Sequence, residues 1–148
     1  MPFRRVLFFL ICLAYGLLFT ATVWAATYTN GLLVDRTVND WNAPPTADSV
    51  QNPVPMSDAS IQDGLSLFTQ NCVACHGADG AGDGPTASFL SPAPANLTTP
   101  DFWKQSDGAI FWKITNGNSP MPSFAGSLTD TQRWDVVNYL RHAFGPKN

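Results

Sequence analysis

Hydrophobic and polar residues follow a helical order in three parts of the chain. Over 57–72 the apolar residues recur every three or four positions, which predicts a helix with a single apolar face. A second helix is expected over 129–144, because Thr-Asp-Thr-Gln forms a capping box at its start and Gly145-Pro146 follows its end. A shorter helix is expected over 107–116 before Gly117, and Thr99-Pro100 is typical of a further helix start.

The N-terminal segment, residues 1–25, is either a signal peptide or a membrane anchor. Arg4 and Arg5 precede Val6–Trp24, which contains no charged residue. Val23-Trp24-Ala25 is an acceptable cleavage site, whereas the apolar length is close to the roughly 20 residues that a spanning helix needs and favours a retained anchor. In both cases the basic start stays in the cytoplasm and the remainder of the chain is exported.

Residues 26–56 have the composition of an extended linker. Asn30-Gly31, Pro44-Pro45 and Asn52-Pro53 are turn or extended signals. Apolar residues such as Leu32 and Trp41 are too frequent for a purely disordered tether. Two interpretations remain open: the segment wraps around its own domain, or it is an arm that docks on a partner subunit.

Composition indicates a small, loop-rich domain with an acidic surface. Charged residues make up 13% of the 148 residues, and the chain contains 12 Pro and 11 Gly. The net charge is −3; without Arg4 and Arg5, 6 basic and 11 acidic residues remain, which gives −5. This balance argues against nucleic acid and against an anionic membrane surface as partners. A core of this size often needs a covalent or metal staple.

The sequence Cys72-Val73-Ala74-Cys75-His76 is the attachment signature of a c-type haem. Both thiols can add to the vinyl groups of one haem, and His76 then becomes an axial iron ligand. A redox dithiol or half of a zinc site would use the same two cysteines. The zinc interpretation lacks a second compact pair of ligands, and the dithiol interpretation lacks a βαβ pattern. In the following stretch 77–85 we expect glycine turns rather than a calcium loop.

Met121 is the candidate for a second axial ligand. It lies between two prolines in Asn-Ser-Pro-Met-Pro-Ser-Phe, so it occupies a loop with a restricted backbone. A thioether is a soft ligand that favours reduced iron. The alternative is a methionine that fills the core. Met56 precedes the first predicted helix without such framing, and His142 near the end of the last helix suits a surface role in the field of the helix dipole.

With these features, residues 57–144 resemble the class I cytochromes c. The resemblance implies an all-α fold of three to five helices around one covalently bound haem c, here in a domain at 57–148 that follows an N-terminal hydrophobic helix and the linker. It also implies Cys72 and Cys75 as thioether ligands, His76 and Met121 as the axial pair, and a close crossing of the first and last helices near Gly64. In this family a proline carbonyl often accepts a hydrogen bond from the ligand histidine, and Pro92 and Pro94 are the candidates.

A narrower resemblance concerns Asn-Pro-Val-Pro before the first helix and the later motifs CHGxxGxGDGP, PxPANLT and MPSF. These are similar to the mono-haem cytochrome subunits of bacterial alternative complex III. The resemblance implies an electron carrier rather than an enzyme, a subunit of a quinol-oxidising membrane complex on the periplasmic face, with a redox protein as donor and another as acceptor. Alternatives are a soluble periplasmic protein after signal cleavage, a cytochrome partner of another oxidase, dehydrogenase or reductase, a haem enzyme or gas sensor with a displaceable methionine, and a structural subunit stapled by its haem.

Overall fold

The computed structural model describes residues 41–147, in which every regular element is a helix or a helical turn. The longer helices are α3 (Asp58–Asn71), α5 (Asp107–Asn116) and α6 (Asp130–Phe144). The shorter elements are α2 (Pro45–Asp48), α4 (Val73–His76) and the 3₁₀ turns η1 (Ala87–Phe89) and η2 (Phe102–Lys104). Within the described residues this agrees with the all-α fold expected from the sequence.

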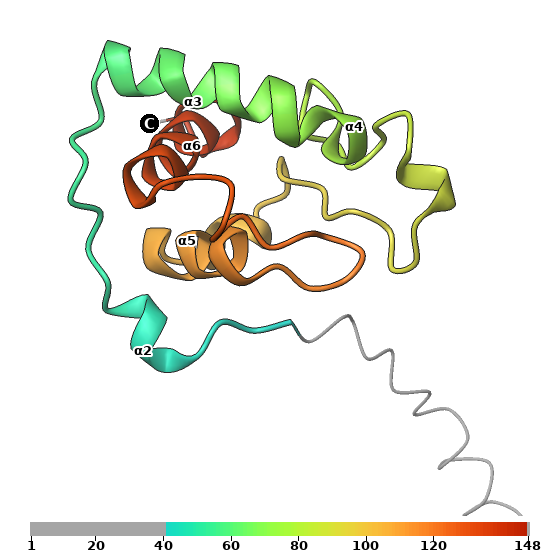
Figure 1. The fold of residues 1–148 in the computed structure, drawn as a ribbon, viewed down its shortest axis with the longest axis horizontal. Coiled ribbons are helices and arrows are strands. Elements are labelled where there is room, and N and C mark those ends of the chain that lie inside the picture. The colour runs from blue at the N-terminus through green and yellow to red at the C-terminus, as the bar shows by residue number, and fades with distance from the viewer. Residues whose placement is uncertain (1–40, 148) are drawn as a thin grey trace, which may run out of the picture. The chain divides into compact units, whose positions relative to one another are not determined.

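Helix α3 crosses α6 closely, as Figure 1 shows at the top of the molecule. Gly64 lies at the crossing, where a Cβ atom would overlap the backbone carbonyl of Asp135. The rings of Phe68 and Tyr139 then meet with centroids 5.3 Å apart. The close contact predicted for Gly64 is therefore confirmed, and it brings the two helix backbones nearer than any larger residue allows.

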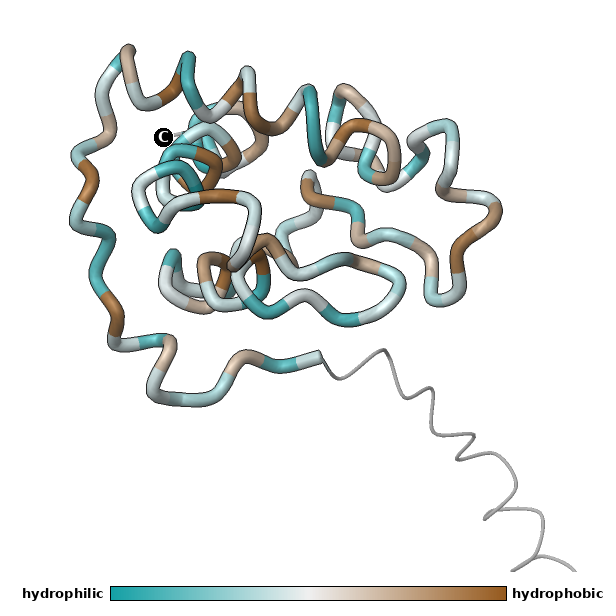
Figure 2. Tube along the Cα trace, in the orientation of Figure 1, coloured by the Kyte–Doolittle hydropathy of each residue, from teal (hydrophilic) through white to brown (hydrophobic). Residues whose placement is uncertain are grey.

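The core fills the space between α3, α5 and α6. In Figure 2 hydrophobic and hydrophilic residues alternate along α3, as expected for a helix with one buried face. Phe111 of α5 stacks on Trp134 of α6 with ring centroids 4.1 Å apart. The fully or mostly buried hydrophobic side chains are Phe68, Leu97, Ile110, Ile114, Phe124, Trp134, Val136, Val137, Tyr139 and Leu140.

Polar caps define the helix starts. The hydroxyl of Ser57 accepts a hydrogen bond from the amide of Ser60 at 3.2 Å, and Thr129 and Gln132 form the predicted reciprocal capping box. The helix predicted to start at Thr99 is shorter than expected. The hydroxyl of Thr99 accepts a hydrogen bond from the amide of Phe102 at 3.3 Å, but only the three-residue turn η2 follows. The helix that continues from there is α5, which begins anew with Ser106 as its cap.

Residues 41–57 run along the side of the domain and contact both α5 and α6 (Figure 1). Ala47 is buried, and the hydroxyl of Ser106 donates to the carboxylate of Asp48 at 2.8 Å. Asn52 donates to the side-chain oxygen of Asn138 at 2.8 Å. The part of the predicted linker that the structure describes thus wraps around its own domain, which extends the domain to residue 41.

The predicted hydrophobic helix at residues 1–25 and the arm before residue 41 lie outside the described residues. Among the helices within 41–147, none combines the length and the apolar character that crossing a bilayer requires.

Candidate haem site

Helix α3 leads directly into the cysteine motif. Cys72 ends α3, since its amide donates to the Phe68 carbonyl at 2.8 Å, and the single turn α4 begins at the next residue. The amide of His76 donates to the Cys72 carbonyl at 2.9 Å, so one helical turn carries both cysteines and the histidine. Burial, and secondarily the neighbouring Cys75, raises the pKa of Cys72 to about 12. Cys72 is therefore held as a neutral thiol, and Cys75 is a second free cysteine on the same turn.

The imidazole of His76 is oriented by a backbone carbonyl. Its Nδ1 donates to the carbonyl oxygen of Ala95 at 3.0 Å, which leaves Nε2 as the nitrogen that can ligate a metal. Burial lowers the pKa of His76, and the hydrogen bond to Ala95 opposes that effect. A neutral ring with one nitrogen engaged is the form that binds iron.

The acceptor is not one of the predicted prolines. The carbonyl of Pro94 faces Gly82, where an added Cβ would lie 2.7 Å from its oxygen. The amide of Leu97 donates to the Gly80 carbonyl at 2.7 Å, which fixes the path of the chain beside the glycine loop. The Ala95 oxygen also lies near Gly82, and it is the one within hydrogen-bond distance of the His76 ring. The prediction of Pro92 or Pro94 is wrong.

Thr86 is a further contact of the motif that the sequence pattern did not indicate. Its amide and its hydroxyl both donate to the carbonyl of Ala74, at 2.9 and 2.7 Å. The same hydroxyl lies 3.3 Å from the sulfur of Cys75. Thr86 therefore fixes the turn that follows the glycine loop against α4; a lone threonine after Gly-Pro carries no signal for this role.

Met121 lies in the segment of residues 117–128, which we call the Met121 segment. The backbone groups of Asn118 and Met121 bond to each other at 3.0 and 2.9 Å and close a tight turn. Ser123 donates to the Thr115 carbonyl at 2.6 Å, and the amide of Phe124 donates to the Ile114 carbonyl at 3.1 Å. The Met121 side chain is partly buried against the core. The restricted loop is as expected, and its ligation of iron stays a prediction.

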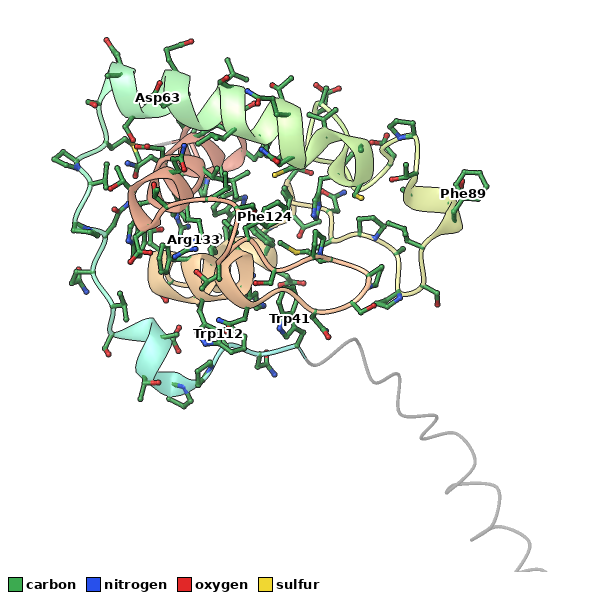
Figure 3. The ribbon with its side chains drawn as sticks, in the orientation of Figure 1. Trp41, Asp63, Phe89, Trp112, Phe124 and Arg133 are labelled. Atoms are coloured by element: carbon green, nitrogen blue, oxygen red, sulfur yellow. The ribbon has the colours of Figure 1, made fainter. Side chains whose placement is uncertain are left out.

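The large apolar side chains of the domain have different environments. Phe68, Leu97 and Phe124 are buried in the core, and Phe102 packs against it. Phe89 is 85% exposed and points away from the body of the domain, as Figure 3 shows. The ring of Phe89, the last residue of the turn η1, therefore lies on the surface of the domain.

Comparison with known proteins connects this geometry to a family. Residues 59–140 match the family described as "Cytochrome C oxidase, cbb3-type, subunit III". The chain belongs to this family of c-type cytochromes. It is 35% identical over 82 residues to cytochrome c6 of Parathermosynechococcus lividus, a match that covers 55% of this chain and 88% of that protein. It is also 35% identical over 83 residues to cytochrome c6 of Bumilleriopsis filiformis, covering 55% and 90%.

The fold is also found in a solved complex. The chain is 30% identical, with a TM-score of 0.56, to a chain of the reducing HAO-like protein complex of Kuenenia stuttgartiensis. This match covers 64% of the present cytochrome and 49% of that chain, so the cytochrome spans about half the length of its structural relative. The cytochrome is thus a mono-haem c-type protein with one haem c bound covalently through Cys72 and Cys75.

The residues present fit this cofactor. Cys72 and Cys75 supply the two thioether positions, and His76 on the same turn would ligate the iron. The indole Nε1 of Trp103 is buried without a hydrogen-bond partner among the described residues, and a haem carboxylate is an acceptor of the kind that it lacks. Haem c supplies a reversible one-electron couple when bound.

Proposed function

We propose that the cytochrome transfers single electrons through a haem whose iron is ligated by His76 and Met121 in both oxidation states. The observation that carries this proposal is the pair of braced ligand segments: Ala95 orients His76, and the Asn118–Met121 turn restricts Met121. Two ligands that stay in place leave little to reorganise when the charge of the iron changes. They also leave no open iron position for a substrate, which favours an electron carrier over a haem enzyme or gas sensor.

A comparison of the wild type with Met121→Ala tests this proposal. The ferric wild type should show the weak red absorption band of iron–methionine ligation, and a potentiometric titration should follow a one-electron curve. Met121→Ala should lose the band and lower the reduction potential, because a thioether favours reduced iron. Met56→Ala, which changes an exposed methionine, is the control. A band that persists in Met121→Ala would refute the assignment, and carbon monoxide binding to the ferrous wild type would favour the open-iron alternatives.

We further propose that the cytochrome is exported and serves as a subunit of a quinol-oxidising membrane complex of the alternative complex III type. The apolar run Val6–Trp24 and the motifs shared with those subunits support export and membrane association. Its structural relative belongs to a multi-protein complex, which supports an assembled rather than a solitary carrier. The family description equally favours a cytochrome subunit of a terminal oxidase as the second candidate.

Purification of the tagged full-length cytochrome from detergent-solubilised membranes separates these candidates. A quinol-oxidising complex should accompany it and reduce its haem when a quinol is added. Co-purification with oxygen-consuming oxidase activity alone would favour the second candidate. Recovery of the haem protein from the soluble periplasmic fraction, without the first 25 residues, would contradict the membrane-anchored assignment.

The chain around Ala95 and Met121 is uncharged, which favours a partner whose docking site is also uncharged. Neither 84–100, which contains Ala95, nor 114–129, which contains Met121, includes a charged residue. Phe89 projects from the first of these stretches, and Thr86 ties that stretch to α4. An exposed aromatic residue surrounded by uncharged loops matches a redox protein with a small apolar docking surface.

A further inference from the structure

Arg133 of α6 is a buried guanidinium with an unusual set of partners. Its side chain is only 6% exposed, and its Nη1 donates to two backbone carbonyls, those of Leu128 at 2.9 Å and Phe124 at 3.3 Å. Its Nη2 donates to the carboxylate of Asp130, which is itself 84% exposed. The guanidinium also lies over the ring of Phe111 at 5.2 Å. Nε is buried and has no hydrogen-bond partner among the described residues, so the contacts of Nη1 and Nη2 are the ones that stabilise this buried charge.

Both carbonyl acceptors belong to the Met121 segment. Phe124 follows Met121 by three residues, and Leu128 is the last residue of the segment before the cap of α6. The amide of Leu128 also donates to the Phe124 carbonyl at 3.0 Å, so Arg133 binds a turn that is already closed on itself. Phe124 is buried in the core, which anchors the same point from the other side.

The segment is therefore fixed at two ends by different means. Before Met121, the fixed points are Gly117, whose φ of 66° suits glycine, and the Asn118–Met121 turn. After Met121, Ser123 and Phe124 bond to carbonyls at the end of α5, and Arg133 adds a charge-assisted donation from α6. Without Arg133 the carbonyls of Phe124 and Leu128 would lose this donor. The segment would keep its bonds to the end of α5 but lose the hydrogen bonds that the Arg133 side chain makes to it from α6.

We propose that Arg133 is a positioning residue that keeps the Met121 segment closed and Met121 on the iron. The proposal rests on Met121 ligation as proposed above. Arg133 acts through the segment, by setting the equilibrium between its closed and its open form. An external ligand binds only to the open form, so its apparent affinity reports the population of that form.

The test is the binding of imidazole to the ferric holoprotein. The loss of the iron–methionine band is the signal that monitors this binding. In Arg133→Gln the apparent affinity for imidazole should rise about tenfold or more, because the open form becomes correspondingly more populated. Arg133→Lys retains the charge but not the fork of donors, so an intermediate increase is expected. If Arg133→Gln does not fold with haem, the imidazole affinity of Arg133→Lys is compared with that of the wild type instead.

Asn138→Ala is the matched control. Asn138 is buried on the same helix and donates to the Val54 carbonyl at 3.2 Å and the Ser60 hydroxyl at 2.9 Å, with no hydrogen bond to the Met121 segment. It should lower the denaturant midpoint while leaving the imidazole affinity within about twofold of the wild type. A second control, Asp130→Asn, removes the exposed ion pair and keeps the two carbonyl contacts, so it should resemble the wild type.

The outcomes separate this inference from the proposed function. A wild type without the iron–methionine band would refute Met121 ligation itself. A wild type with the band, and Arg133 variants that bind imidazole no more tightly than Asn138→Ala, would refute the positioning role alone. The positioning role is supported if imidazole affinity increases in the Arg133 variants but not in Asn138→Ala, although these variants share the same denaturant midpoint.

Discussion

Gly82 and Ala95 lie so close that a Cβ atom on Gly82 would be 3.2 Å from the carbonyl oxygen of Ala95. This oxygen is the one that accepts the hydrogen bond from Nδ1 of His76. The glycine loop and the orientation of the histidine are therefore coupled through a single backbone carbonyl. A hydrogen bond of this kind orients the imidazole and increases its basicity towards a metal.

Gly82→Ala should weaken that hydrogen bond. The added methyl group would also approach the Pro94 carbonyl, and φ at residue 82 is +81°, which an alanine adopts only with strain. A less basic imidazole stabilises ferric iron less, so the reduction potential should rise by something on the order of tens of millivolts. Potentiometric titration measures it. Gly126→Ala is the control because its Cβ would meet nothing within 4 Å. Equal reduction potentials in folded Gly82→Ala and Gly126→Ala would contradict the coupling between the glycine loop and His76.

The helices and the haem motif were predictable because their signals are local. Ser57, the capping box at Thr129 and the spacing of the cysteines each fix a turn through groups within a few residues. The Ala95 acceptor was not predictable, because the direction of a carbonyl depends on how two distant loops pack, here through Leu97 and Gly80. The reach of Arg133 to Phe124 likewise requires the tertiary fold, since arginine at that helix position is ordinarily a surface residue.

The wrap formed by residues 41–57 should contribute to stability. Asn52→Ala removes the hydrogen-bond donor to the side-chain oxygen of Asn138. Asn138 is a buried residue that is only 2% exposed. An acceptor left without its partner in the interior costs about 1–3 kcal/mol in the free energy of unfolding. Denaturant unfolding of the holoprotein measures the loss, with the exposed neighbour Gln51→Ala as control. Were both variants to unfold at the wild-type midpoint, the segment would be better understood as a docking arm.

Stability at high pH should depend on Tyr139. Burial, and secondarily the negative charge of Asp79, raises its pKa in the folded protein. The unfolded chain then releases this proton first, at about pH 10, so the free energy of unfolding should fall as the pH rises through and above that value. Below this range the raised pKa has no effect on stability.

Tyr139→Phe removes the titrating group and isolates its contribution. The difference in unfolding free energy between this variant and the wild type should be constant from neutral pH to about pH 9 and then shift in favour of the variant. Asp79→Asn should reduce the alkaline loss only slightly, because burial is the larger cause. Parallel curves for the wild type and Tyr139→Phe up to about pH 11 would show that the phenol ionises equally in both states.

Phe89 offers a way to locate the surface through which electrons leave. In a mixture of ferrous and ferric cytochrome, two copies should exchange electrons through the uncharged stretches 84–100 and 114–129, and NMR line broadening measures the rate. Phe89→Asp would place like charges opposite each other in that encounter, so the rate at low salt should fall several-fold, roughly as expected for charges brought within a Debye length. Phe89→Leu should change it little. Met56→Asp adds the same charge at another exposed apolar residue, so it separates local repulsion from net charge. Equal slowing by Phe89→Asp and Met56→Asp would mean that the contact lies elsewhere. Slowing that is confined to Phe89→Asp and relieved by added salt would identify the surface around Phe89 as the exchange surface.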